Sequence, residues 1–147
     1  MKRYIKAKIG NILDEDITYQ CAVAADPNSD PEILQLLSDS DDVVIRGKVA
    51  MNPSTSVEVL SLLADDVDPY VRGCIASNEC APVDILMKLA DDSDYRVRVE
   101  VALYTEFEDV LRHLAGDGDP KVLEALEENP NMPVNILRKV KRRLNEL

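Results

Sequence analysis

Residues of the same type recur every 26 positions along much of this chain. The segment Val-Val-Ile-Arg-Gly-Lys-Val-Ala at 43–50 is answered by Tyr-Val-Arg-Gly-Cys-Ile-Ala at 70–76. The positions that keep this step include Arg46, Arg72 and Arg98, Ala24, Ala50, Ala76 and Ala102, and Asp16, Asp42, Asp68 and Asp94. A unit of this length cannot bury its own apolar face and is stabilised by stacking on its neighbours. The period therefore predicts an all-α solenoid of about five 26-residue units over residues 16–140.

The first half of each unit is expected to be a short helix. Asp68-Pro69 and Asp119-Pro120 are helix-start signals, because aspartate accepts hydrogen bonds from the free N–H groups and proline is tolerated at the first helical position. Asn52-Pro53 is a break, because the residue before proline is disfavoured in helical geometry. One residue is missing near position 105, after which Asn129 resumes the spacing of the asparagines.

The second half of each unit is also expected to be helical. Ser29 and Glu32, like Thr55 and Glu58, have capping-box spacing, in which a hydroxyl and a carboxylate satisfy N–H groups of the first turn. Apolar residues at helical spacing follow each box, which favours a helix with one buried face.

The combined pattern is Val-Arg-x-x-Ile/Val-Ala-x-Asn-Pro followed by Ser/Thr-x-x-Glu-Val-Leu-x-x-Leu-Ala-Asp-Asp. It resembles the leucine-rich repeat variant family, a relative in shape of HEAT repeats, over residues 16–140. The resemblance implies a right-handed α-solenoid of two-helix repeats with short, 3₁₀-like first helices. A founding member of that family carries an iron–sulfur cluster on a cysteine-rich N-terminal segment. This chain has no such segment, so we expect no cofactor and no metal.

Arg46, Arg72 and Arg98 are expected to align as a ladder when the units stack. An aspartate precedes each arginine by four residues, so the two side chains can meet on one helix face. The first interpretation is structural, with each arginine paired to an aspartate of its own or the next unit. The alternative is that the arginines line a groove that binds a carboxylate or phosphate through their planar forks.

The fourth unit departs from the repeat and is the second candidate binding region. It contains Tyr104 and Phe107 beside acidic residues, with Tyr95 upstream and His113 downstream. Aromatic and acidic groups together suit a basic peptide, through stacking and cation–π contact. The alternative is that Tyr104 and Phe107 fill the gap left by the missing residue. We expect His113 to be a surface residue.

The charge distribution argues against nucleic acid as a ligand. The formal net charge is −11, and residues 9–137 hold 8 basic against 27 acidic side chains. Binding to a phosphate backbone depends on lysine and arginine, whereas an acidic body attracts basic partners. No run of apolar residues is long enough for a membrane span. Three cysteines without metal-ligand spacing favour reduced thiols and a cytoplasmic location.

The ends of a solenoid must be covered. Residues 1–15 have apolar side chains at roughly helical spacing and are expected to form an N-terminal helical cap. The last stretch, from Val134, is expected to be an amphipathic capping helix with a basic end at 141–147. Its basic face could instead contact nucleic acid, an anionic membrane surface or the acidic body of another copy.

These features favour a non-catalytic protein- or peptide-binding module or scaffold. The chain lacks a glycine-rich phosphate loop, a nucleophile elbow and histidines at metal-binding spacing, so we expect no enzyme. The first alternative is an acidic mimic of nucleic acid that inhibits a DNA- or RNA-binding protein. The second is a HEAT-like enzyme that processes nucleic acid. The sequence leaves the oligomeric state open.

Overall fold

The chain is all-α over residues 12–147, the part that the computed structural model describes. Residues 12–14 are helical and Ile12 is buried, whereas positions 1–11 of the expected N-terminal cap lie outside the described residues. The helices are α2 (Ile17–Ala25), α3 (Pro31–Leu37), α4 (Val43–Met51), α5 (Val57–Leu63), α6 (Pro69–Cys74) with the 3₁₀ turn η1 (Ile75–Ser77), α7 (Val83–Leu89), α8 (Tyr95–Tyr104), α9 (Glu108–Leu114), α10 (Pro120–Glu128) and α11 (Val134–Glu146). Within this part, none of the helices has the length and apolar character that crossing a bilayer requires.

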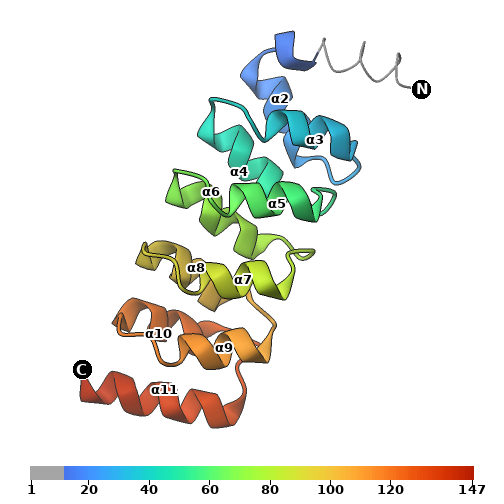
Figure 1. The fold of residues 1–147 in the computed structure, drawn as a ribbon. Coiled ribbons are helices and arrows are strands. Elements are labelled where there is room, and N and C mark those ends of the chain that lie inside the picture. The colour runs from blue at the N-terminus through green and yellow to red at the C-terminus, as the bar shows by residue number, and fades with distance from the viewer. Residues whose placement is uncertain (1–11) are drawn as a thin grey trace.

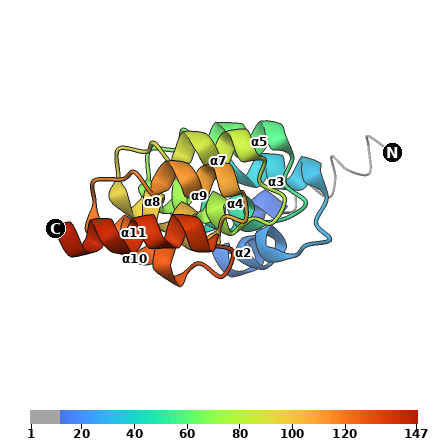
Figure 2. The ribbon, with the colours of Figure 1, turned by 90° about the horizontal axis from the view of Figure 1, so that it is seen from below.

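The helices stack in chain order as two rows, with α2 and α11 at opposite ends (Figure 1). We call α2, α4, α6, α8 and α10 the first-helix row, because each comes from the first half of a sequence unit. Each helix of this row contacts the next. The remaining helices, α3, α5, α7, α9 and α11, form the second-helix row, which lies along one side of the first (Figure 2).

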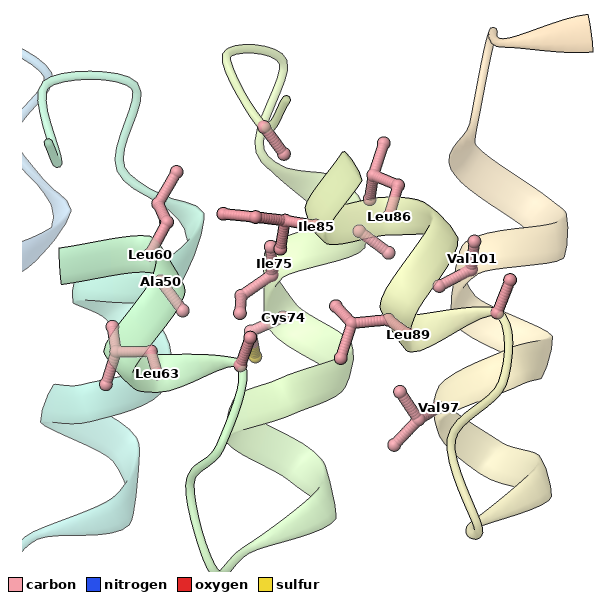
Figure 3. Close-up of a cluster of buried hydrophobic side chains, with 14 of the residues drawn as sticks. Ala50, Leu60, Leu63, Cys74, Ile75, Ile85, Leu86, Leu89, Val97 and Val101 are labelled. Carbon is pink, nitrogen blue, oxygen red and sulfur yellow. The ribbon is translucent and has the colours of Figure 1, made fainter. Parts of the chain in front are cut away.

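The apolar core lies between the two rows. Figure 3 shows Leu60 and Leu63 of α5 and Leu86 and Leu89 of α7 close to Ile75, and all five are buried. The second-row helices from α3 to α9 have only seven residues each. Helices this short are not stable alone in water. Each of them therefore depends on burying its apolar face against the neighbouring helices.

The predicted starts of the first-row helices are confirmed. Asp68 and Asp119 each accept a hydrogen bond of 2.9 Å from the backbone N–H two residues on. Pro69 and Pro120 are the first residues of α6 and α10. The local sequence alone sets these helix starts, because both the cap and the proline act within one turn.

The predicted capping boxes are wrong by one residue. The side chains that cap α3 and α5 are those of Asp30 and Ser56. Ser29 and Thr55, the residues expected to cap, each donate their hydroxyl at 2.6 Å to a carbonyl six residues earlier, in the preceding helix. These hydroxyls therefore join the two helices of a unit rather than start the second one.

Buried asparagines link successive first-row helices, and we call these links the asparagine rungs. Asn52, Asn78 and Asn129 each end a first-row helix and are at most 4% exposed. The Asn78 amide donates to the carbonyls of Ala50 (2.9 Å) and Asn52 (2.8 Å) in the preceding unit. Its Oδ1 accepts from a backbone N–H two residues on, at 2.9 Å. Each rung thus satisfies backbone groups of two units at once.

The fourth unit interrupts these rungs. Helix α8 has ten residues where α4 and α10 have nine, and it ends at Thr105 instead of asparagine. The Thr105 hydroxyl accepts from the N–H of Phe107 at 3.3 Å. A threonine has no amide that could donate to two carbonyls of the preceding unit. The residue missing from the sequence is the net result of a longer helix and a shorter connection to α9.

Replacing Asn78 with alanine is expected to lower the free energy of unfolding by about 2–4 kcal/mol, because it leaves two buried carbonyls and one partly buried N–H without their partner. The Asn78→Asp variant should cost at least as much, since it keeps the acceptor but turns a carboxylate toward the two carbonyls. Urea denaturation followed by circular dichroism measures both. Asn135→Ala, at an exposed position of α11, is the control; an equal loss in this control would contradict the role of the rung.

Candidate functional site

The three arginines of the predicted ladder form bidentate pairs within the chain. The Nε and Nη2 atoms of Arg72 donate to the Asp92 carboxylate at 2.7 and 2.9 Å. Its Nη1 donates at 2.8 Å to the carbonyl of Asp66, in the loop before α6. We call the set the arginine column; its pairs are Arg46 with Asp66, Arg72 with Asp92, and Arg98 with Asp117. The side chains of these pairs are no more than 18% exposed, so the guanidinium groups are largely committed to internal partners.

The expected pairing with the aspartate four residues earlier is wrong. Asp68, which precedes Arg72 by four residues, instead accepts from the N–H of Tyr70 as the cap of α6. The backbone N–H of Asp68 donates to the Asp66 carboxylate at 2.9 Å. The Asp68 carboxylate binds the start of the helix and not Arg72, because the N–H groups of the first turn have no acceptors within the helix. The arginine reaches the next aspartate along the fold, 20 residues further on.

The arginine of the column is absent from the first and the fifth units, and its partners change with it. In the first unit Gln20 replaces the arginine, and Ser40 stands at the position that holds aspartate in the next unit. The two members of the ion pair are therefore lost together. In the fifth unit Leu123 replaces the arginine, and Arg143 of α11 donates to the carbonyl of Asp117 at 2.9 Å. A residue from a different helix thus closes the column.

The column fixes the charge state of its carboxylates. Partial burial acts to raise the pKa of Asp66, Asp92 and Asp117, but hydrogen bonds from the arginines and from backbone N–H groups outweigh it. The pKa of each therefore lies below its ordinary value. Since these carboxylates are ionised and paired, they contribute less free negative charge to the surface than the composition suggests.

The aromatic candidates of the fourth unit do not form one cluster. Tyr95 and Tyr104 lie at opposite ends of α8. The Tyr95 ring already holds a cation, the Nζ of Lys121, at 4.9 Å from its centroid. Phe107 is partly buried and packs against the core, as expected for a residue that fills a gap. Only Tyr104, 55% exposed, presents most of its ring to the surface.

His113 lies on the surface, as the sequence indicates. Its Nε2 is 2.7 Å from Oδ1 of Asp91, and both side chains are largely exposed. One unit earlier, Lys88 pairs with Asp65 at the same distance. The two pairs therefore make a second, exposed set of contacts between neighbouring units.

A hollow of about 480 Å³ opens on the first-helix row between α6 and α8, and we call it the α6–α8 groove. Tyr70 and Tyr104 are half exposed beside it, and Met51 of α4 borders it. Its lining also includes Gly73, Cys74 and the charged residues Asp68, Arg96 and Glu100. The groove thus combines aromatic and aliphatic walls with two carboxylates and one guanidinium.

Glu100 is the chemically distinctive group of the groove. Burial raises its pKa, and no neighbouring charge contributes to the shift. The adjacent Cys74 thiol is buried, and this burial raises its pKa, which disfavours the reactive thiolate. The groove therefore contains a carboxylate whose pKa no neighbouring cation lowers.

Sequence reasoning did not find this groove. Lys48, Cys74 and Glu100 occupy one position of the 26-residue period, and the residue type changes in every unit. Because this position does not keep its residue type, it gives no repeat signal. A signal was nevertheless present, because Cys74 and Glu100 lie one helical turn after Tyr70 and Arg96, which line the same groove.

The chain matches no protein-family model, and neither curated proteins nor solved structures show a significant similarity to it. Among residues 12–147, no group of three or more histidine, cysteine, aspartate or glutamate side chains is placed to hold a metal ion. The site is therefore interpreted from its own geometry.

Replacing Arg72 with methionine is expected to lower the free energy of unfolding by about 2–3 kcal/mol at pH 7, because it leaves a largely buried carboxylate without its cation. The pKa of Asp92 is lowered in the folded protein, so this stabilisation is complete above the ordinary value of 3.8 and is lost as the pH falls through the folded pKa. Urea denaturation at pH 7 and in acid measures the difference between the wild type and the variant. Arg142→Met, at an exposed position, is the control, and a pH-independent cost at position 72 would contradict the ion pair.

Glu100 is expected to titrate above its ordinary value of 4.5. Because the folded pKa is raised, the ionised carboxylate costs stability above that pKa, and the cost disappears as the pH falls toward the ordinary value. The Glu100→Gln variant should therefore melt at a higher temperature than the wild type at pH 7, with the gap closing in acid. Carboxyl-carbon NMR gives the pKa, and a value at or below 4.5 would contradict the burial of this side chain.

Proposed function

We propose that this chain is a non-catalytic peptide- or protein-binding module. In this proposal it is a right-handed α-solenoid of about five 26-residue repeats, of the leucine-rich repeat variant type, that works in the cytoplasm. The stacked rows of α2 to α11 and the internal rungs support the repeat interpretation. Solenoids present extended surfaces to which partners bind, and this chain would use the outer face of its first-helix row.

The observation that carries the proposal is the α6–α8 groove with its exposed aromatic rim. Tyr70 and Tyr104 keep about half of their surface in contact with water. Tyrosine is enriched among the residues that dominate binding energy, because a rigid ring buries a large area at a small cost in entropy. Tyr95 and Phe107 are engaged inside the molecule, so Tyr104 is the member of the predicted aromatic set that is free to bind a partner.

The arginine column favours a structural role over the groove proposed for it from the sequence. Each guanidinium of the column binds a carboxylate and a carbonyl of the chain, which uses the planar fork that a partner's carboxylate or phosphate would need. We therefore place the partner on the aromatic groove and not on Arg46, Arg72 and Arg98.

The same pairing weighs against a mimic of nucleic acid. A mimic would display unpaired carboxylates at the spacing of phosphates. Here Asp66, Asp92 and Asp117 are bound by arginines, and the exposed Asp65 and Asp91 are bound by Lys88 and His113. The remaining acidic charge suits long-range attraction of a basic protein.

Selection of a random peptide display library on the purified chain tests this proposal. Selected peptides should bind the wild type and lose about tenfold or more in affinity on Tyr104→Ala, a loss typical of an aromatic residue at the centre of an interface. Leu62→Ala, which also truncates an exposed side chain but lies on α5 in the other row, should leave binding unchanged. Failure to select any peptide, or selection of peptides that bind Tyr104→Ala as well as the wild type, would overturn the proposal.

A further inference from the structure

The α6–α8 groove lies at a joint that lacks the tyrosine ring present at the preceding joint. At the preceding joint, between α4 and α6, the ring of Tyr70 lies against Gly47. A Cβ atom added to this glycine would lie only 2.6 Å from the ring. One period later Gly73 takes the place of Gly47, and Arg96 takes the place of Tyr70. A tyrosine ring thus lies against the glycine of one joint, and an arginine stands at the equivalent position of the next.

Arg96 does not cover Gly73. Its guanidinium folds back onto the cap of its own helix, with Nη2 at 2.6 Å and Nε at 3.0 Å from the Asp94 carboxylate. The nearest group to a Cβ added at Gly73 would be the Glu100 side chain, at 3.3 Å. The Glu100 side chain therefore lies against Gly73, which is buried, and lines the slot together with Tyr70 and Tyr104.

The charges around this slot are unbalanced toward the negative. Its ionisable lining consists of Asp68, Arg96 and Glu100, apart from the Cys74 thiol and the tyrosine hydroxyls. Arg96 is neutralised by Asp94, and Asp68 is used as a helix cap. Burial raises the pKa of Glu100 because the ionised form lacks a compensating charge. A cation entering the slot would supply that charge.

We propose that the α6–α8 groove binds the side chain of a lysine or arginine in a peptide segment of a partner protein, with its cation paired to Glu100. This inference rests on the proposed function and specifies its ligand. The aliphatic stem of such a side chain would lie against the rings of Tyr70 and Tyr104, as basic side chains do when only their heads are polar. A cation already lies beside another tyrosine of α8, because the Nζ of Lys121 is 4.9 Å from the centroid of the Tyr95 ring. The net charge of −11 would speed the arrival of a basic segment.

Short peptide libraries with one fixed central residue and randomised flanks test the ligand class. The central residue is lysine, arginine, norleucine, glutamine or glutamate, and binding to the full chain is measured by fluorescence anisotropy over a salt series. Lysine or arginine libraries should bind about tenfold more tightly than the norleucine library, which has the same stem without the charge. Comparison of the lysine and arginine arms shows which basic head group the slot prefers.

Two variants locate the effect. Glu100→Gln should abolish the preference for a basic residue and leave the norleucine library unchanged. Glu58→Gln makes the same change of charge at an exposed site on α5 and should keep the preference. Arg96→Tyr places a ring over Gly73, as Tyr70 lies over Gly47, and should block binding of every library while circular dichroism shows the fold retained.

The outcomes separate this inference from the proposed function. Libraries that bind, and that lose affinity on Tyr104→Ala, but show no basic preference would overturn the ligand class and leave the peptide-binding function standing. A basic preference that survives Glu100→Gln would also overturn the inference, because attraction by the overall charge would then explain it. Absence of binding by all libraries would overturn both.

Discussion

The arginines of the column hold this stack in register. Each guanidinium binds a carboxylate of its own unit and a carbonyl of the loop that precedes its helix. Arg72 does so between Asp92 and Asp66, and the other members of the arginine column repeat the arrangement. Each aspartate of the column also accepts from the backbone of the next helix cap. The column therefore ties α4, α6 and α8 each to the loop that precedes the next first-row helix.

The apolar core cannot supply this precision by itself. Leucine and valine side chains contact one another without directional preference, so a slip between short helices would cost little in buried area. The asparagine rungs and the arginine column impose directional contacts on opposite ends of the first-row helices. Between them, these contacts fix the backbone of α6 and α8, whose side chains line the groove.

The sequence predicted the period, the helical class and the starts of α6 and α10, because these depend on contacts within one turn or on repeated residue types. It did not predict the partners of the arginines, since Asp92 is far from Arg72 along the chain and is reached only through the fold. The slot beside Glu100 was missed for a related reason. The slot depends on the direction in which the Arg96 side chain turns. Two aspartates, Asp68 and Asp94, were possible partners for it, and the sequence does not show which of them it binds.

The loss of one asparagine rung has a mechanical consequence. Thr105 leaves the joint between α6 and α8 without the amide that ties neighbouring first-row helices elsewhere, as in the rung that Asn78 forms to α4. Since it has fewer polar contacts of this kind than the joint between α4 and α6, we expect this joint to bend more easily than that one. The groove lies at the same joint, so a bound ligand would resist bending there and stiffen the whole stack.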